Sequence, residues 1–152
     1  PCYEWQHVLV LPKDHPLAAK ERVSLEDLAS EPIITYHPSF TGRTRIDHAF
    51  AQKKLTPRIA LEAIDSDVIK TYVRLGLGVG IVAEMAVRDE SNADLVVRPM
   101  GHVFGQNIAR VAFKRSAYLR NFVFKFAELL SDRLDRNLIA KALSGHQQDY
   151  EL

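Results

Sequence analysis

Short apolar runs alternate with amphipathic segments over the first two thirds of this chain. The runs are rich in β-branched residues and stop at prolines or polar turns, which predicts buried strands at residues 7–11 and 32–36, further strands at 58–63 and 79–83, and a short edge-type strand at 94–99. Between them, apolar positions recur at helical spacing, which predicts helices near residues 24–29, 41–55 and 66–75. Strands that alternate with helices indicate βαβ units, so we expect an α/β domain with a mainly parallel sheet flanked by helices.

The pattern changes after residue 106. Residues 107–114 alternate between two faces and form the clearest β segment of the chain. From Ser116 onward the spacing is helical, with one apolar stripe formed by Leu119, Phe122, Val123, Phe126, Leu129 and Leu130. Such a stripe indicates either core packing or a face that pairs with another copy of the chain. A second amphipathic stretch covers residues 134–143, and we expect residues 144–152 to form a flexible tail.

The composition is that of a packed globular domain. Hydrophobic residues make up 47% of the chain and charged residues 26%, and the formal net charge of +1 shows no basic excess for nucleic acid. The single cysteine, Cys2, forms no internal disulfide, which favours a reducing compartment. No apolar run approaches the roughly 18 residues of a membrane helix, and the first residues lack the blocks of a signal peptide. We therefore expect a cytoplasmic protein with no membrane partner, and the absence of an initiator methionine indicates a fragment or a processed chain.

Residues 35–43 form a polar turn between a predicted strand and a predicted helix. Ser39 and Thr41 carry hydroxyl groups, and Gly42 lets the backbone come close to a bound molecule. The first N–H groups of a helix have no partners within the helix, so an anion can satisfy them. The same residues also fit an ordinary helix cap, in which Thr41 bonds the amides of its own first turn. The two interpretations are compatible, because a capped N-terminus can also hold an anion.

A second polar turn, Asp65-Ser66-Asp67, follows the next predicted strand. Ligands of open α/β sheets bind beyond the carboxyl ends of the strands, so both turns can face one crevice. The acids of the second turn suit an ammonium group or a hydroxyl. We find no nucleophile with a base, no paired carboxylates and no metal-binding spacing, which predicts neither an enzyme nor a metal site. The glycines of residues 76–80 follow a helix and precede a strand, the reverse of a dinucleotide-binding loop.

Several stretches resemble the effector-binding region of LysR-type transcriptional regulators. They are His15-Pro16-Leu17-Ala18, Ser24-Leu25-Glu26-Asp27-Leu28, Pro32-Ile33-Ile34 and residues 73–82, with the sequence VRLGLGVGIV. Phe40-Thr41-Gly42-Arg43 and residues 55–59 and 67–80 resemble the CysB branch of that family, the regulators of sulfur assimilation and sulfonate utilisation. The resemblance covers nearly the whole chain up to the tail.

The resemblance implies a periplasmic-binding-protein-like α/β fold of two subdomains with an effector in the cleft between them. Residues 3–106 would form the complete second subdomain. Residues 107–143 would return to the first subdomain, with a strand at 108–113 and a helix at 117–130. Most of the first subdomain and the winged helix-turn-helix would lie outside the chain, so DNA would be bound only through that absent N-terminal domain.

The resemblance also implies an effector. In the CysB branch a small anion, sulfate or thiosulfate, or an acylated serine such as acetylserine binds in the cleft, and the threonine that the second subdomain contributes falls on Thr41. The candidate effector site therefore comprises Tyr36, Ser39, Phe40, Thr41 and Gly42, with Asp65, Ser66 and Asp67 as further contacts and no cofactor. The stretch His37-Pro38-Ser39 departs from the pattern of the cysteine regulators, which leaves a sulfonate-pathway anion as an alternative effector.

Regulators of this family associate through their effector regions, so we expect a homo-oligomer, a dimer or a tetramer, or a rearranged C-terminal segment. A periplasmic-type solute-binding protein for a small anion is the alternative function, because it has the same fold. An upstream winged helix would favour a regulator, and an upstream signal peptide would favour a transport protein.

Overall fold

The computed structural model describes residues 1–88, 92–114 and 118–144. The residues cluster into two compact units, one formed by Trp5–Asn107 and the other by Pro1–Glu4 with Ile108–Leu152. The predicted tail lies almost entirely outside the described residues. We describe each unit by itself.

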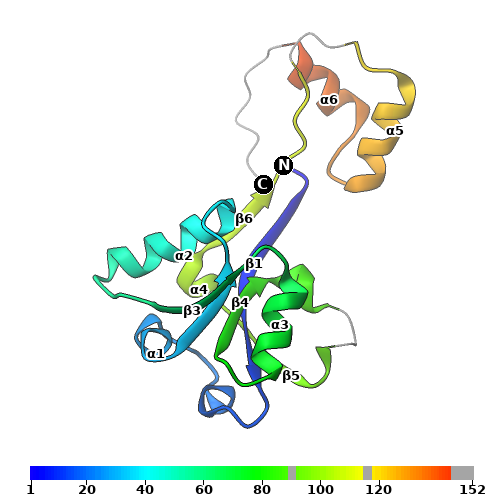
Figure 1. Ribbon diagram of the computed structural model, residues 1–152. Helices are drawn as coiled ribbons and strands as arrows, with labels where there is room; N and C mark the ends of the chain where they lie inside the picture. The colour runs from blue at the N-terminus through cyan, green and yellow to red at the C-terminus, as the bar shows by residue number, and fades with distance from the viewer. Residues whose placement is uncertain (89–91, 115–117, 145–152) are drawn as a thin grey trace. The chain divides into compact units, whose positions relative to one another are not determined.

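A mixed β-sheet forms the centre of the unit Trp5–Asn107 (Figure 1). Its strands include all five predicted apolar runs, as β1 (Tyr3–Pro12), β2 (Pro32–Tyr36), β3 (Arg58–Ala63), β4 (Val79–Ala83) and β5 (Leu95–Pro99). They lie in the order β3-β2-β4-β1-β5, and β6 (Gln106–Ala109) pairs with β1. The prediction of these strands is confirmed.

The direction of β1 differs from that of its neighbours. β2 pairs in parallel with β3 and with β4, whereas β1 is antiparallel to both β4 and β5. β2, β3, β4 and β5 therefore share one direction, as a mainly parallel sheet requires, and β1 runs against them. As a consequence, the first residues of β1 lie at the edge of the sheet where β2, β3 and β4 end.

The predicted helices begin where the sequence placed them. α1 (Leu25–Ala29) opens with a capping box between Ser24 and Asp27. α2 (Thr41–Gln52) ends before the predicted Leu55, because Lys54 adopts a left-handed conformation with φ 57°. α3 (Ser66–Arg74) follows Asp65, and short helical turns form η1 (Pro16–Ala19), η2 (Glu84–Val87) and α4 (Gly101–Phe104). Within the described ranges, no helix is long and apolar enough to cross a bilayer.

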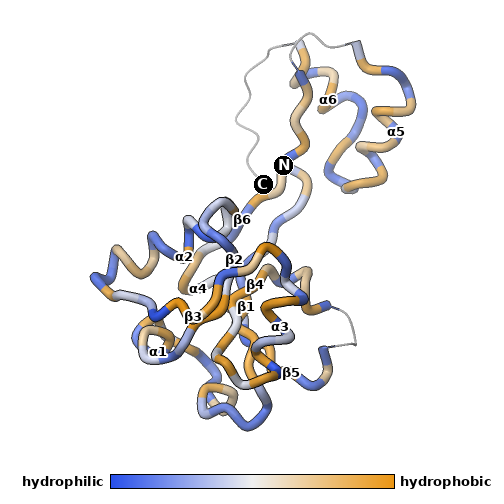
Figure 2. Tube along the Cα trace, viewed as in Figure 1, coloured by the Kyte–Doolittle hydropathy of each residue, from blue (hydrophilic) through white to orange (hydrophobic). Residues whose placement is uncertain are grey.

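Each face of the sheet carries its own core, because side chains alternate along a strand. Leu9 and Leu11 of β1 pack under α1, α2 and α4 with residues such as Phe50 and Met100. The intervening residues of β1 pack on the opposite side under α3, in a cluster that contains Val8, Val10, Ile34, Ile69, Val73 and Val82. Figure 2 shows the apolar residues concentrated along the strands of this unit. The sheet is thus covered by helices on both faces.

The unit that contains Ile108–Leu152 departs from the sequence prediction. The predicted strand of residues 107–114 stops at Ala109, because its partner strand β1 begins only at Tyr3. Beyond that point the Cys2 N–H donates a backbone hydrogen bond to the Ala109 carbonyl at 2.9 Å. The predicted helix at 117–130 is wrong in its start: residues 118–120 are not helical, and α5 covers Asn121–Leu130. α6 (Arg136–Leu143) matches the second amphipathic stretch. Phe124, Ala127, Leu134 and Ile139 form the core of this unit.

Candidate functional site

Two helix N-termini lie at the edge where the parallel strands end. β2 ends at Tyr36 and leads to α2, and β3 ends at Ala63 and leads to α3. The two strand ends are joined by a hydrogen bond that the His37 N–H donates to the Ala63 carbonyl at 3.0 Å. The predicted polar turns therefore follow the ends of adjacent strands, at the edge where ligands of open α/β sheets bind.

Tyr36 connects several parts of this edge. Its phenolic oxygen accepts a hydrogen bond from the Ala83 N–H at the end of β4, at 3.1 Å, and its ring lies 5.9 Å from the ring of Phe40. Burial raises the pKa of Tyr36, the carboxylate of Asp65 acts in the same direction, and hydrogen bonds with Ala83 and Ser66 oppose the shift. The structure thus brings Tyr36 into contact with Phe40 and Ser66, and the phenol stays neutral.

The N-terminus of α2 has no side-chain cap. Phe40 occupies the cap position and Thr41 is the first helical residue, so the interpretation of Thr41 as the cap is wrong. The Ser39 hydroxyl also does not cap the helix, because it pairs with His37 Nδ1 at 3.0 Å. In the described part of the chain no protein acceptor is found for the N–H groups of Thr41 and Gly42. Two amide donors and the exposed Thr41 hydroxyl are therefore available to a bound anion.

Arg43 supplies positive charge next to these amides, but its guanidinium is already occupied. Its Nε donates to Asp47 at 2.7 Å, and its Nη1 donates to Glu62 at 2.7 Å and to the Tyr36 carbonyl at 2.8 Å. Burial opposes its charge, but the two carboxylates outweigh burial and raise the pKa of Arg43. The buried Arg43 side chain therefore fixes α2 against the ends of β2 and β3, and its charge is neutralised.

Trp5 and His7 belong to this edge although the sequence did not predict them as site residues. The antiparallel register places His7 beside Ala83, and the His7 ring lies 5.1 Å from the ring of Trp5. A Cβ atom on Gly42 would lie 3.1 Å from His7 Nε2 and 3.5 Å from Trp5 Cη2, so the two rings pack against the first turn of α2. The hydrophobic pattern identified this strand but not its direction, and only the direction brings these rings to the site.

His7 is completely buried, and neither ring nitrogen has a hydrogen-bond partner in the part of the chain that the structure describes. Burial is the main cause that lowers the pKa of His7 from 6.5 to about 4, and the positive charge of Arg45 acts in the same direction. The Gly42 backbone opposes the shift, although neither nitrogen reaches hydrogen-bond geometry with it. His7 is therefore a neutral imidazole at the amino end of α2.

The acids of the second turn have structural partners. The Asp65 carboxylate caps α3 by accepting from the Asp67 N–H at 2.6 Å. Asp67 forms an ion pair with Lys70 at 2.8 Å, and this pair lowers the pKa of the Asp67 carboxyl. Ser66 is the member of this turn that forms a hydrogen bond with Tyr36, and Asp65 acts on Tyr36 through its charge. Among the residues that the structure describes, no cluster of three or more histidine, cysteine, aspartate or glutamate side chains could hold a metal ion.

Comparisons with known proteins show which family this chain resembles. Residues 1–135 match the LysR substrate binding domain. The chain is 54% identical over 152 residues to the HTH-type transcriptional regulator CysB of Burkholderia cenocepacia, with 100% of this chain and 49% of that protein covered. It is 44% identical over 143 residues to the HTH-type transcriptional regulator SsuR of the same organism, with 94% and 46% covered. The chain thus spans about half the length of these regulators.

Solved structures give the same result for the fold. The cofactor-binding domain of the Cbl transcriptional regulator matches with a TM-score of 0.83 and 41% identity, over 95% of this chain and 64% of that domain. The regulatory domain of Synechocystis CcmR, in complex with 2-PG, matches with a TM-score of 0.68 at 17% identity, over 90% and 66% of the two chains, and shares the fold alone. The expected periplasmic-binding-protein-like α/β fold and the resemblance to the CysB branch are confirmed.

Proposed function

Because this chain belongs to the LysR substrate-binding-domain family, we propose that it is the effector-sensing part of a CysB-like transcriptional regulator of sulfur metabolism that acts in the cytoplasm. The effector is a small anion of that metabolism, sulfate or thiosulfate, or an acylserine or sulfonate with an equivalent anionic group. The observation that carries this proposal is the uncapped N-terminus of α2, where Thr41 and Gly42 offer donors without protein partners.

The site binds an anion with neutral groups. Backbone N–H groups and the positive end of the helix dipole stabilise a negative charge, and the Thr41 hydroxyl adds a further donor. The guanidinium of Arg43 does not contribute directly, because Asp47 and Glu62 already hold it. Phe40 and Trp5 add apolar surface beside these donors, which suits an effector with a short carbon chain as well as an inorganic anion.

Regulation requires that the effector bind one arrangement of the regulator better than another. An anion held by α2 therefore shifts the regulator only if it binds one such arrangement better, and a useful coupling amounts to about 1–3 kcal/mol. DNA is bound through a separate N-terminal domain, and the regulator assembles as a dimer or a tetramer.

The experiment that tests this proposal replaces Thr41 by valine, which keeps the shape of the side chain and removes the hydroxyl. We expect T41V to fold normally and to weaken sulfate or thiosulfate binding by about tenfold to a hundredfold, the value of a hydrogen bond to a charged group. Isothermal titration calorimetry on the protein at its native length measures the change.

Thr44→Val is the matched control, because Thr44 is exposed on the same helix, beyond its first residues. T44V should bind the anion like the unmodified protein. Equal affinities of the unmodified protein and T41V would remove Thr41 from the site. Failure of sulfate, thiosulfate, acetylserine and short sulfonates to bind at all would contradict the proposed function.

A further inference from the structure

His7 is a buried polar side chain without a polar partner. Its exposed fraction is 0%, and neither Nδ1 nor Nε2 has a hydrogen-bond partner among the residues described, 1–88, 92–114 and 118–144. Buried polar atoms are nearly always satisfied, since an unsatisfied donor or acceptor destabilises the folded state. An imidazole has one N–H donor and one acceptor nitrogen in its neutral form, so both capacities of His7 are unused. An exception of this kind calls for an explanation.

The surroundings of His7 direct it toward the amino end of α2. Nε2 lies 3.1 Å from the position that a Cβ atom of Gly42 would occupy, and Gly42 carries one of the two unpaired N–H groups. Trp5 contacts His7 from β1 itself, and Phe104 contacts it from α4 at a ring distance of 5.7 Å. The buried imidazole and the uncapped helix are thus two independent features of one location, and both lack a polar partner.

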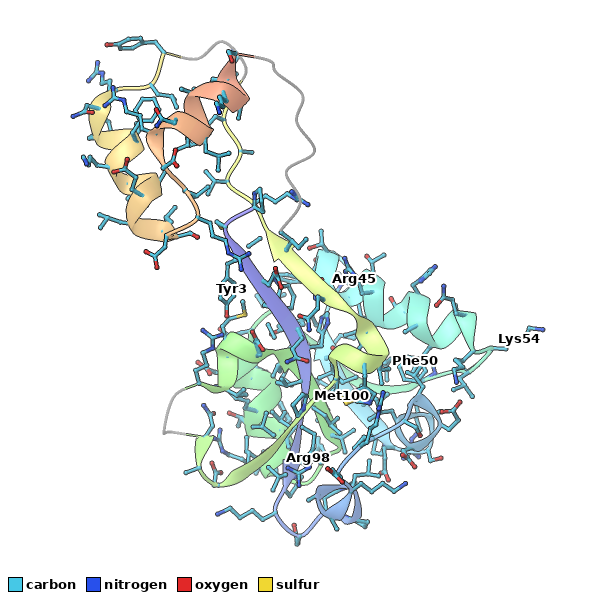
Figure 3. The ribbon with its side chains drawn as sticks, turned by 180° about the vertical axis from the view of Figure 1, so that it is seen from behind. Tyr3, Arg45, Phe50, Lys54, Arg98 and Met100 are labelled. Atoms are coloured by element: carbon cyan, nitrogen blue, oxygen red, sulfur yellow. The ribbon has the colours of Figure 1, made fainter. Side chains whose placement is uncertain are left out.

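One cation acts on His7 from the elements packed around it. Arg45 extends from α2, with Nη1 3.5 Å from the position of a Cβ atom on Gly105, and Figure 3 shows it on α2 beside β6. The other neighbours of His7 carry no charge. Ala83 lies beside it on β4, Phe104 contacts it from α4, and Gly42 contacts it from α2. The residues of β6 are also uncharged. None of these described neighbours is an acid that would stabilise a protonated imidazole, and the positive charge of Arg45 opposes protonation.

We propose that His7 is a specificity-determining residue of the effector site, and that an anion bound at the first turn of α2 is taken up together with one proton on the His7 imidazole. This inference rests on the proposed function. The anion supplies the negative charge that the surroundings of His7 lack, and it offsets the repulsion from Arg45. The proton comes from the solvent and forms an N–H bond at the free ring nitrogen, and no other bond changes.

Proton uptake gives the site a preference among anions. A dianion compensates both the imidazolium and Arg45 better than a monoanion does, because the interaction grows with charge in a buried location. The site therefore favours sulfate or thiosulfate over a monoanion such as nitrate, and it favours them more strongly as the pH falls. A neutral, partner-free residue at position 7 would show no such pH dependence.

The first test counts protons in the unmodified protein at its native length. Calorimetric titrations with sulfate, in buffers of different ionisation enthalpy at about pH 6.5, give the number of protons bound per sulfate. Sulfate keeps its own charge in this range, so any proton belongs to the protein. We expect uptake of about one proton, and an affinity that rises by up to about tenfold for each pH unit between about pH 7.5 and about pH 5.5.

Two variants assign the proton to a residue. His7→Gln places a polar side chain that does not titrate at the position of the imidazole. H7Q should bind sulfate without proton uptake, and its affinity should not change with pH. His37→Gln is the matched control, because His37 lies in the turn before α2 but is exposed and pairs with Ser39. H37Q should keep both the proton uptake and the pH profile.

The outcomes separate the two proposals. Sulfate binding without proton uptake in the unmodified protein overturns the role of His7 and leaves the proposed function intact. Loss of the pH dependence in H37Q but not in H7Q assigns the proton to His37 and also overturns it. If H7Q does not fold, the ring nitrogen chemical shifts of His7 in the unmodified protein, measured by NMR with and without sulfate, decide whether that imidazole gains the proton. Absence of binding by any anion of the panel contradicts the proposed function itself.

Discussion

At the scale of single residues, two buried polar side chains on either side of the α2 N-terminus have opposite environments. Arg43 has hydrogen bonds to Asp47, to Glu62 and to the Tyr36 carbonyl, so its burial is compensated. Neither ring nitrogen of His7 has a hydrogen-bond partner among the described residues. Arg43 therefore stabilises the structure of the site, whereas burial of the His7 imidazole destabilises the folded state in a way that depends on pH.

The lowered pKa of His7 makes the folded state sensitive to acid. The folded protein holds His7 with a pKa of about 4, and the unfolded chain has the ordinary value of 6.5. Between these values the unfolded state binds more protons, so stability falls as the pH decreases through this window and is recovered above pH 6.5. The shift corresponds to a loss on the order of 3 kcal/mol.

Urea denaturation at about pH 7 and about pH 4 should show this loss in the unmodified protein without effector, and His7→Phe should lose less stability over the same interval. The comparison concerns the change with pH, because H7F also alters packing against Trp5 and Phe104. Identical changes in the two proteins would show that the buried imidazole does not titrate in this range.

At the scale of elements, the sequence pattern predicted the features that depend on residues close together in the chain. The helix that begins after Ser24, the strand at Ile33 and the start of α3 after Asp65 all depend on nearby residues, and all were predicted. The strand expected at Ile108 to Phe113 was too long because a strand also requires a neighbour, and pairing is not encoded in the alternation itself. The direction of β1 is likewise a property of the whole sheet, which is why Trp5 and His7 were missed.

The N-terminus of α2 offers a test of the conflict between stability and binding. Phe40 holds the cap position with the extended conformation that capping residues adopt, but it has no acceptor side chain. Phe40→Asp would place a carboxylate on the free amides. We expect F40D to raise the free energy of unfolding by about 0.5–1 kcal/mol and to weaken sulfate binding by more than about tenfold, because the carboxylate occupies the donors and repels the anion.

Phe40→Ala is the control for loss of the aromatic ring, since alanine neither caps the helix nor repels an anion. F40A should bind sulfate more tightly than F40D, and denaturation and titration of both variants give the comparison. Undiminished sulfate affinity in F40D would place the anion away from the first turn of α2.

At the scale of the whole molecule, all residues of the proposed site belong to the unit Trp5–Asn107. The chain contains one tryptophan, Trp5, and its ring packs against Gly42. Trp5 fluorescence therefore reports on the site and on the folding of the unit that carries it. Calorimetry, by contrast, records the unfolding of both units.

An effector that binds the folded state stabilises it by mass action. At a sulfate concentration of about one hundred times Kd the expected stabilisation is about 2.7 kcal/mol, which raises the midpoint of the Trp5 fluorescence transition by several degrees. Sulfate also stabilises proteins nonspecifically through exclusion from their surface, and that contribution should be the same in Thr41→Val. The specific part is the difference between the two proteins at equal sulfate concentration. A fluorescence midpoint that rises equally in both would mean that sulfate acts only as a salt, whereas a larger rise in the unmodified protein identifies binding at the first turn of α2.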